Sequence, residues 1–414
     1  MVGARVFVVF SLGFLISYLF RGVNLTLAPE LAAELALTPA DLGLLTSLYF
    51  VTFAGFQIPL GMLLDRFGPR RVDAALLCVA AAGALVFAFA QSREALMLGR
   101  LLIGVGVSAC LMAALKAMII WFPKDRLPSL NGGVFAIGGL GAVAAATPIE
   151  LALAVTDWRG IFVGLAVLTL AVAVLILAAV PERRTEQPDL GLAAQLRGVR
   201  QVVGSGLFWR VAPLTMLTQG VFMAIQGLWA GPYLQVVEGF DRLAAANAVA
   251  LIGFGMVAGY WLSGVGARWL GRRGITLRAT AGAGMLLFVV VQALILLGLP
   301  LPPAATWVVY GFFGGTGVVS YAVLNVAFPA HLAGRVSTAL TLTMFASAFL
   351  FQVGIGLALG WMETAGIDGA NAHRSVWLAM LLLQAAAFVW YCVPAPGADR
   401  VDLPLAAAER SGRP

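Results

Sequence analysis

The chain has 414 residues, of which 61% are hydrophobic and 11% are charged. Soluble domains average about 25% charged residues, so this composition excludes a protein that faces water on all sides and indicates a membrane protein. The net charge of +7 requires no nucleic-acid partner, because membrane proteins retain lysine and arginine on their cytoplasmic side. The three cysteines, Cys78, Cys110 and Cys392, lie in apolar stretches, which argues against a disulfide framework.

Apolar stretches recur along the chain. A spanning helix needs about 20 apolar residues, and Arg21, together with the lack of a small-residue cleavage site, argues against reading the first stretch as a cleaved signal peptide. The expected fold is an all-α membrane protein with twelve transmembrane helices. The predicted spans are residues 6–29, 42–64, 73–91, 96–121, 130–153, 160–180, 209–235, 244–266, 276–298, 304–327, 336–361 and 375–394.

The basic residues between the predicted spans are distributed unequally. With a cytoplasmic N-terminus, 19 arginines and lysines fall inside and 4 outside, whereas the acidic residues divide evenly. This asymmetry follows the positive-inside rule. It predicts that both termini are cytoplasmic and that a bacterial protein would lie in the inner membrane.

The longest hydrophilic stretch divides the chain in two. We expect an N-terminal six-helix bundle over residues 1–180, a cytoplasmic linker over 181–208, a C-terminal six-helix bundle over 209–394 and a cytoplasmic tail over 395–414. A shift of 203 positions takes Pro29 to Pro232 and Gly61 to Gly264. Such a repeat predicts two pseudo-symmetric bundles with a binding site between them near the midplane.

A glycine-rich basic motif follows the second predicted span. The glycines allow close helix approach, and the aspartate lies where the positive end of the third span can be neutralised. A basic turn alone would explain the arginines but not this spacing. The motif consists of Gly61, Asp65, Arg66, Gly68, Arg70 and Arg71.

This motif resembles the loop signature of the major facilitator superfamily. Arg100, one turn before Gly104, is similar to a second motif of that family, and Asp157-Trp158-Arg159 is similar to the start of its sixth span. The resemblance implies a secondary transporter in which the loop motif latches the two halves and takes part in the conformational switch. We group Arg100 with the switch, in helix packing or gating.

The first predicted span contains an arginine, Arg21, deep in its apolar stretch. The segment from Tyr18 to Pro29 resembles the first span of sugar-phosphate and glycerol-phosphate antiporters, in which an arginine binds the anion, but the matching second arginine is missing. The pattern also fits broader anion-transporting families with one arginine for a carboxylate. An unpaired arginine in a bilayer is costly. Arg21, on a polar stripe with Asn24, therefore contacts a ligand, forms an ion pair with Glu150, or reaches the outer surface.

Further polar residues follow helical faces within the spans. Glutamine is expensive in lipid, so these faces must meet protein or water. Lys116 and Arg100 cannot both face one cavity on a straight helix, and Lys116 is left open between the cavity and the membrane interface. The predicted substrate-binding residues are Arg21, Asn24, Gln57, Lys116, Gln219, Gln226, Trp229, Tyr321, Asn325 and Gln352.

This cavity would be positive on one side and rich in amides and hydroxyls on the other. We expect a secondary active transporter that moves a small organic anion, with a carboxylate as the charged group, by alternating access. Glu150 is the predicted proton-coupling residue. We predict a monomer with no enzymatic activity, no cofactor and no metal. The alternatives are efflux of amphipathic compounds and a non-transporting receptor of the same fold.

Overall fold

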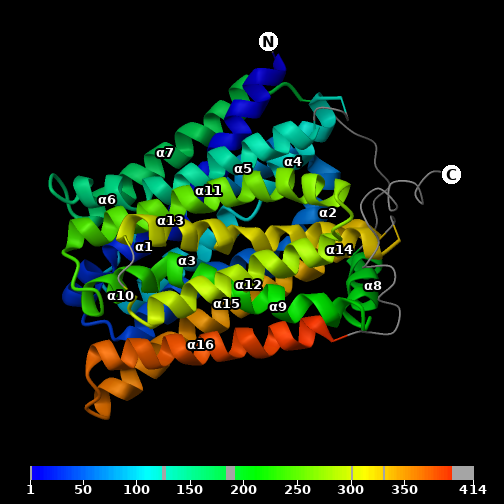
Figure 1. The fold of residues 1–414 in the computed structure, drawn as a ribbon. Helices are drawn as coiled ribbons and strands as arrows, with labels where there is room; N and C mark the ends of the chain where they lie inside the picture. Colours follow the sequence, from blue (N-terminus) through cyan, green and yellow to red (C-terminus); the bar gives the residue numbers. More distant parts are fainter. Residues whose placement is uncertain (1, 124–126, 183–191, 300–301, 330–331, 394–414) are drawn as a thin grey trace.

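The computed structural model describes residues 2–123, 127–182, 192–299, 302–329 and 332–393, and the regular structure in them is helical (Figure 1). Twelve helical segments in this part of the chain are long and apolar enough to cross a membrane. They coincide with the twelve predicted spans, which confirms the all-α membrane fold. The protein is therefore an integral, multi-pass membrane protein.

Seven helices form the N-terminal half. The first span runs along α1, and α2 contains both the second span and the third. Gly68 joins these two spans with φ of 77°, a left-handed conformation that favours glycine. The elements are α1 (Val2–Leu35), α2 (Pro39–Ala88), α3 (Arg93–Gly106), α4 (Cys110–Trp121), α5 (Leu127–Ala144), α6 (Thr147–Ala152) and α7 (Trp158–Ala179).

A connecting helix and the C-terminal half follow. The short helix α8 (Leu192–Val203) lies within the predicted linker. The C-terminal half contains α9 (Phe208–Ala224), the π-helix η2 (Ile225–Trp229), α10 (Ala230–Val236), α11 (Arg242–Arg272), α12 (Leu277–Leu296), α13 (Pro303–Gly314), the 3₁₀-helix η3 (Gly315–Val318), α14 (Val319–Ala327), α15 (Ala333–Thr364) and α16 (Gly369–Cys392).

Four spans that the sequence presents as continuous are interrupted. The fourth breaks between α3 and α4, the fifth breaks between α5 and α6, the seventh contains η2 and the tenth contains η3. Each interruption changes which side chains share a face, because the residues per turn differ from those of an α-helix. The straight-helix argument that separated Arg100 from Lys116 therefore does not hold, since the two lie on different helices.

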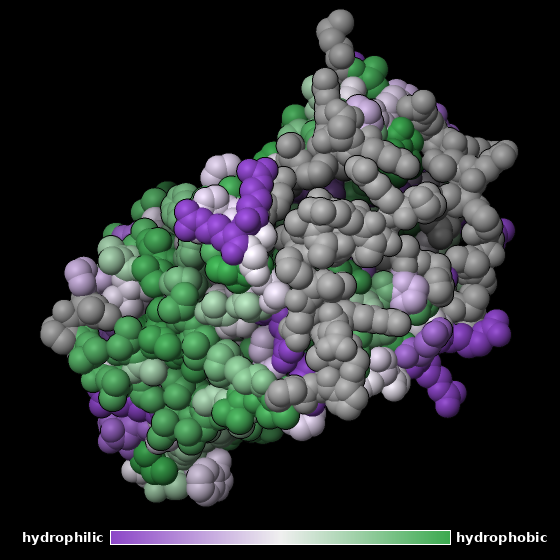
Figure 2. Space-filling view, turned by 45° about the vertical axis from the view of Figure 1, so that its right-hand side comes forward, coloured by the Kyte–Doolittle hydropathy of each residue, from purple (hydrophilic) through white to green (hydrophobic). Residues whose placement is uncertain are grey.

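The outer surface matches a lipid environment. Figure 2 shows a broad field of hydrophobic residues with hydrophilic side chains at its margins. Helices α7 and α16 contribute many of the exposed apolar side chains, including Val167, Val174, Leu382 and Val389. Exposed apolar surface on this scale is unusual for a soluble protein.

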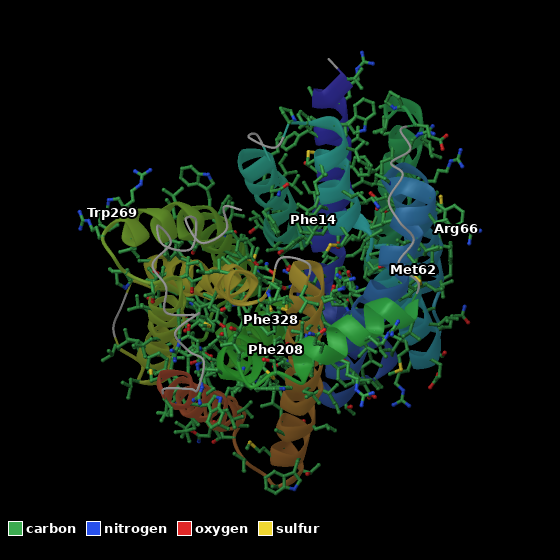
Figure 3. The ribbon with its side chains drawn as sticks, turned by 90° about the vertical axis from the view of Figure 1, so that its right-hand side faces the viewer. Phe14, Met62, Arg66, Phe208, Trp269 and Phe328 are labelled. Atoms are coloured by element: carbon green, nitrogen blue, oxygen red, sulfur yellow. The ribbon has the colours of Figure 1, made fainter. Side chains whose placement is uncertain are left out.

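The bundle has two distinct ends. We call the end of the bundle that carries α8 the linker end. We call the opposite end, where Glu30 near the end of α1 pairs with Arg242 at the start of α11, the Arg242 end. Viewed from the linker end, Phe14 on α1 and Phe328 beyond α14 come from opposite halves and lie toward the middle, whereas Arg66 and Trp269 lie at the margins (Figure 3).

Acidic residues cap helices at the Arg242 end. Asp157 accepts a hydrogen bond from Gly160 N at the start of α7, and Asp241 accepts one from Ala244 N at the start of α11. These contacts satisfy backbone donors that have no partner within the helix. The local sequence thus sets where these helices begin.

The halves approach closely at a glycine in the middle of the bundle. A methyl group placed on Gly139 of α5 would clash with the side chain of Val257 of α11. The aromatic rings of Phe53 on α2 and Phe345 on α15 stack across the halves with centroids 4.7 Å apart. Small residues allow such backbone approach in membrane helices.

A reciprocal amide pair joins α12 and α16 in the interior of the C-terminal half. Gln292 Nε2 donates to Gln384 Oε1 at 2.9 Å, and Gln384 Nε2 donates back to Gln292 Oε1 at 3.1 Å. Both side chains are fully buried. The pair supplies hydrogen bonds to two side-chain amides that would otherwise lack partners in apolar surroundings.

We expect the Gln292→Leu variant to lose about 1 kcal/mol of stability, because it leaves the Gln384 amide without its partner. The Gln292→Leu/Gln384→Leu double variant should recover most of this loss. Thermal unfolding of the wild type, both single variants and the double variant in one detergent forms the cycle that measures the coupling. Additive losses would show that the two amides do not support each other.

Candidate functional site

Arg21 lies beside a small cavity between the two halves. The cavity is lined from α1 and α5 on one side and from η2 and α11 on the other, which places it at the interface between the bundles. Its lining residues are Tyr18, Arg21, Gly22, Ala142, Ala145, Gln226, Gly227 and Val249. Of the predicted binding residues, the structure brings Arg21 and Gln226 together here.

The guanidinium of Arg21 is held by aromatic rather than acidic side chains. It lies 3.9 Å from the centroid of the Tyr18 ring, and the Tyr18 hydroxyl lies 3.5 Å from that of Tyr260 on α11. Nη2 of Arg21 is buried and has no hydrogen-bond partner. Among the described residues no carboxylate pairs with Arg21, so its positive charge is available to an anion.

The π-helix η2 shapes the opposite wall. A π-helix shifts the register of side chains, and such helices are frequent at functional sites. Gln226 Nε2 points to Met256 Sδ at 3.5 Å, and Trp229 Nε1 donates to Gln352 O at 3.3 Å. The predicted polar face of the seventh span is therefore divided, with Gln219 on α9 and Gln226 and Trp229 on η2.

Two buried amides near this wall have unused hydrogen-bonding atoms. Gln352 on α15 is fully buried, and neither atom of its amide has a hydrogen-bond partner. A methyl group on Gly227 would lie 3.5 Å from Gln352 Nε2, so Gly227 separates Gln352 from the cavity of Arg21. Asn24 Nδ2 donates to Thr46 Oγ1 at 3.4 Å, while Asn24 Oδ1 is unpaired. Unsatisfied buried amides are costly and fit a site that receives polar ligand groups.

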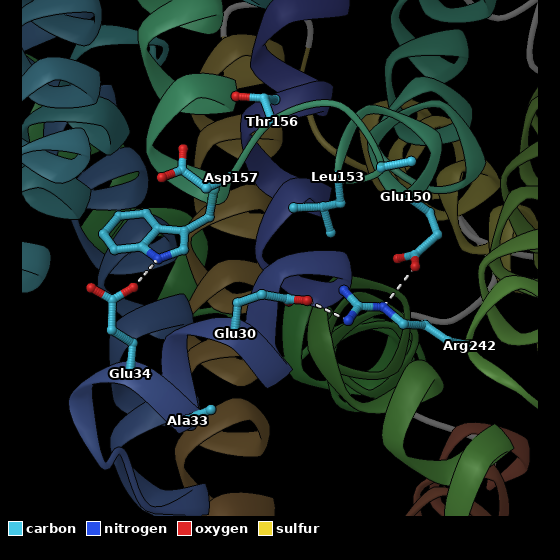
Figure 4. Close-up of a pocket in the computed structure, with 10 residues that line it drawn as sticks. Glu30, Ala33, Glu34, Glu150, Leu153, Thr156, Asp157 and Arg242 are labelled. Atoms are coloured by element: carbon cyan, nitrogen blue, oxygen red, sulfur yellow. Dashed lines mark hydrogen bonds and ion pairs between the residues drawn. The ribbon is translucent and has the colours of Figure 1, made fainter.

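Glu150 does not pair with Arg21, which corrects one of the sequence alternatives. It lies on α6 at the Arg242 end, where its Oε1 is 2.7 Å from Arg242 Nε. Arg242 also forms an ion pair with Glu30 of α1 (Figure 4). In addition, it donates to Thr26 O at 3.4 Å. The sequence did not identify this bridge because its partners are far apart in the chain.

The Arg242 bridge closes one end of the interface between the halves. Glu30 and Glu150 belong to the N-terminal half and Arg242 to the C-terminal half. A surface pocket of about 730 Å³ beside them also contains Glu34 and Trp158 (Figure 4). Thr147 Oγ1 of the N-terminal half also donates to Asn247 Oδ1 of the C-terminal half at 2.7 Å.

The cations of the fourth span are engaged with backbone carbonyls. Arg100 is 1% exposed, and its Nη1 donates to Phe20 O at 2.8 Å. Lys116 Nζ donates to Leu64 O at 3.0 Å. Both cations therefore contact neighbouring helices of the N-terminal half, and neither lines the cavity beside Arg21.

The remaining predicted binding residues contact neighbours within their own half. Gln57 Nε2 donates to Ser108 O at 3.3 Å, and Gln219 Nε2 donates to Gly314 O at 2.7 Å. Tyr321 shares a 2.7 Å hydrogen bond with Thr341, and Asn325 Nδ2 donates to Ser337 Oγ at 3.2 Å. Their role in binding stays a prediction, since none of them lines the cavity beside Arg21.

The sequence profile of the Major Facilitator Superfamily matches residues 10–352. This chain belongs to that superfamily. The computed fold agrees, since the D-xylose-proton symporter superposes with a TM-score of 0.74 at 15% identity and the match covers 96% of this chain and 98% of that one. At that identity the likeness concerns the fold alone.

Two curated members of the superfamily illustrate its similarity to anion transporters. The probable sulfoacetate transporter SauU of Cupriavidus necator is 26% identical over 66% of this chain and 67% of that protein. The hexuronate transporter of Escherichia coli K12 is 26% identical over 63% of this chain and 65% of that protein. The chain thus spans about two thirds or less of the length of the curated relatives it matches.

The loop motif of this superfamily member makes contacts within the N-terminal half. Arg71 Nη2 lies 2.6 Å from Glu182 Oε1, Arg70 donates to Leu177 O, and Arg66 is exposed. Gly68 supplies the turn described above, and Gly61 lies on α2 before it. The side chain of Asp65 lies outside the described part of the structure. The latch between the halves remains a prediction.

Sequence reasoning missed two sets of residues. Tyr18 and Tyr260 meet across the halves beside Arg21, although tyrosines in apolar spans gave no positional signal. Asp73 is fully buried within α2, and no role was predicted for this acid from the sequence. Its position at the edge of a predicted span could have indicated it. No three potential metal ligands gather among the described residues.

Proposed function

We propose that this protein is a secondary transporter for small organic monoanions, with the anionic group bound at Arg21. The observation that carries the proposal is that Arg21 lines an interface cavity and that its buried Nη2 atom has no hydrogen-bond partner. Binding an anion would supply the missing charge-assisted hydrogen bonds. A carboxylate fits a guanidinium in planar, bidentate geometry.

The charge balance of the interface favours one negative charge on the substrate. Arg100 and Lys116, the other cations deep in the N-terminal half, already donate to backbone carbonyls. A dianion would therefore bring a second charge into a region without a second available cation, at a high desolvation cost. The unpaired amides of Asn24 and Gln352 suit hydroxyl groups on the substrate body.

The similarity to relatives supports a carboxylate as the anionic group. The sulfoacetate and hexuronate transporters are named for compounds that each carry a carboxylate. A hexuronate has one negative charge, as proposed here, whereas sulfoacetate has a second one on its sulfonate. In alternating access, the closed Arg242 bridge would block one side of the site while the other side opens. We further propose that the linker end is cytoplasmic, consistent with its excess of arginine, and that transport is coupled to protons.

A thermal-shift comparison of the purified full chain tests the substrate class. We expect D-glucuronate and other monocarboxylates to raise the unfolding temperature, because a ligand bound only by the folded state stabilises it by about 2.7 kcal/mol at 100 times its Kd. D-glucose is the uncharged control and glucose 6-phosphate the dianionic one. Equal stabilisation by glucose would refute anion recognition, and stronger stabilisation by the dianion would refute the preference for one charge.

A further inference from the structure

Asp73 is a buried carboxylate to which the proposed binding site assigns no role. It lies on α2, seven residues into the span that begins at Arg66, or about 10 Å along the helix axis. The side chain is fully buried, and neither carboxylate oxygen has a hydrogen-bond partner. An ionised carboxylate without a partner is strongly disfavoured in apolar surroundings, so this group holds its proton here.

A glycine and a thiol enclose the carboxyl group. A methyl group on Gly13 of α1 would lie 3.5 Å from Asp73 Oδ2, 4.0 Å from Cys110 Sγ of α4 and 4.0 Å from Leu77 Cδ1. These are ordinary contact distances. The absence of a side chain at Gly13 therefore leaves room above the carboxyl group, which a small movement of α1 can open or close.

The charged groups of the surrounding helices are directed elsewhere. From α4, the Cys110 thiol faces Asp73, and Lys116 donates to Leu64 O. Of the other basic groups on the packed helices, Arg5 of α1 is exposed, Arg21 lies against Tyr18, Arg93 of α3 pairs with Asp41, Arg100 of α3 donates to Phe20 O, and Arg159 of α7 pairs with Glu34. On α2 itself, Arg66 is exposed, and Arg70 and Arg71 lie within ion-pair distance of Glu182. No described cation therefore compensates a charge on Asp73.

Helix α1 connects this carboxyl group to the substrate site. Gly13, Ser17 and Arg21 follow one another at intervals of four residues and share a face of the helix. Between them, Ser17 Oγ lies 3.2 Å from the Tyr49 hydroxyl, and Tyr49 also donates to Ser17 O at 3.1 Å. A movement of α1 when Arg21 binds an anion would thus be transmitted to Gly13, about 12 Å away. It would change how closely Gly13 packs over the Asp73 carboxyl group.

We propose that Asp73, enclosed by Gly13 and Cys110 in the N-terminal half, takes up and releases the coupling proton. When α1 moves, water reaches the carboxyl group and takes up its proton. The carboxylate binds a new proton when it is next exposed to the opposite side of the membrane. This inference rests on the proposed anion transport. Glu150, the residue expected from the sequence, instead lies 2.7 Å from Arg242 Nε in the bridge and acts in closure of that end.

The protonation of Asp73 can be tested without a substrate. Infrared difference spectra of the purified full chain in lipid nanodiscs report protonated carboxylic acids. We expect a band in the wild type at pH 7 that is absent from Asp73→Asn, retained in Glu150→Gln, shifted in deuterated buffer and lost reversibly on alkaline titration. Identical spectra for the wild type and Asp73→Asn would overturn the proposal. A band that never exchanges with deuterium would identify a structural acid and would overturn it equally.

A second variant keeps the test decisive if Asp73→Asn fails to fold. The Gly13→Ser variant places a hydroxyl group near Oδ2 at a distance that the packing tolerates. A hydrogen bond to the ionised carboxylate favours that form, so the band should disappear at a lower pH, by roughly one unit. The Gly13→Ala variant, which adds the same carbon without the hydroxyl, is the matched control. Equal titration in both variants would contradict the proposed placement.

Proteoliposomes then separate coupling from binding. With D-glucuronate as the probe, a gradient of about one pH unit can drive roughly tenfold accumulation per coupled proton. We expect Asp73→Asn to lose this accumulation while it still exchanges labelled for unlabelled glucuronate at equal pH. Gradient-driven accumulation in Asp73→Asn would overturn the coupling role. If the wild type neither binds nor moves the probe, the proposed anion function fails, and the infrared result alone decides whether Asp73 is an exchanging proton site.

Discussion

Replacement of Arg21 by glutamine is expected to abolish anion binding and transport without unfolding the protein. The variant removes the one guanidinium at the interface cavity that has an unpartnered nitrogen. Loss of a buried charge pair with the ligand should weaken binding by about 2 kcal/mol or more, which is roughly 30-fold. Removing an uncompensated charge from the interior should at the same time maintain or raise the stability of the unliganded protein.

Arg100→Gln provides the matched control for this prediction. Arg100 is also buried, but it donates to Phe20 O and lies near the rings of Phe87 and Phe162. We expect its replacement to lower the unfolding temperature, whereas Arg21→Gln should mainly remove the thermal shift caused by glucuronate. Unchanged glucuronate binding and uptake in Arg21→Gln would contradict the assignment of the substrate site.

A disulfide across the Arg242 end is expected to stop transport reversibly. Thr147 and Asn247 belong to opposite halves, and their side-chain oxygens are 2.7 Å apart. Thr147→Cys/Asn247→Cys, with alanine in place of the three native cysteines, should therefore form a cross-link when oxidised. Because alternating access requires this end to open, uptake of glucuronate should fall at least about tenfold and return after reduction.

A cross-link within one half distinguishes locking from nonspecific damage. Gln292 and Gln384 touch through the ends of their side chains inside the C-terminal half, so a short bis-thiol reagent that bridges cysteines at these positions should leave the relative movement of the halves free. The Gln292→Cys/Gln384→Cys variant should retain most of its uptake after cross-linking. Full activity of the oxidised Thr147/Asn247 pair would show that this end need not open.

Short-range patterns carried most of the correct predictions. The twelve spans follow from long apolar stretches, because each helix must satisfy its own backbone hydrogen bonds in lipid. Gly61, Gly68 and the adjacent arginines indicated the superfamily because the motif is contiguous. Arg21 could be selected as a site residue because a charge at that depth in an apolar stretch is expensive wherever it points.

Contacts between distant segments decided the rest. The bond between Glu150 and Arg242, and the meeting of Tyr18 with Tyr260, join residues about a hundred or more positions apart. Interruptions such as η2 also changed the faces of the spans, which a regular helical period does not anticipate. For this reason several predicted lining residues, including Gln219 and Lys116, were found bonded to backbone carbonyls.

The sequence by itself determined that the chain crosses a membrane twelve times, which superfamily it resembles and that one arginine lies at membrane depth, because hydrophobicity and contiguous motifs act locally. The tertiary structure alone decided which charges are paired. It placed Arg242 between two acids, left Nη2 of Arg21 without a hydrogen-bond partner beside the interface and buried both carboxylate oxygens of Asp73 without one. The physical reason is that the free energy of a charge in a membrane protein depends on the groups that packing brings around it.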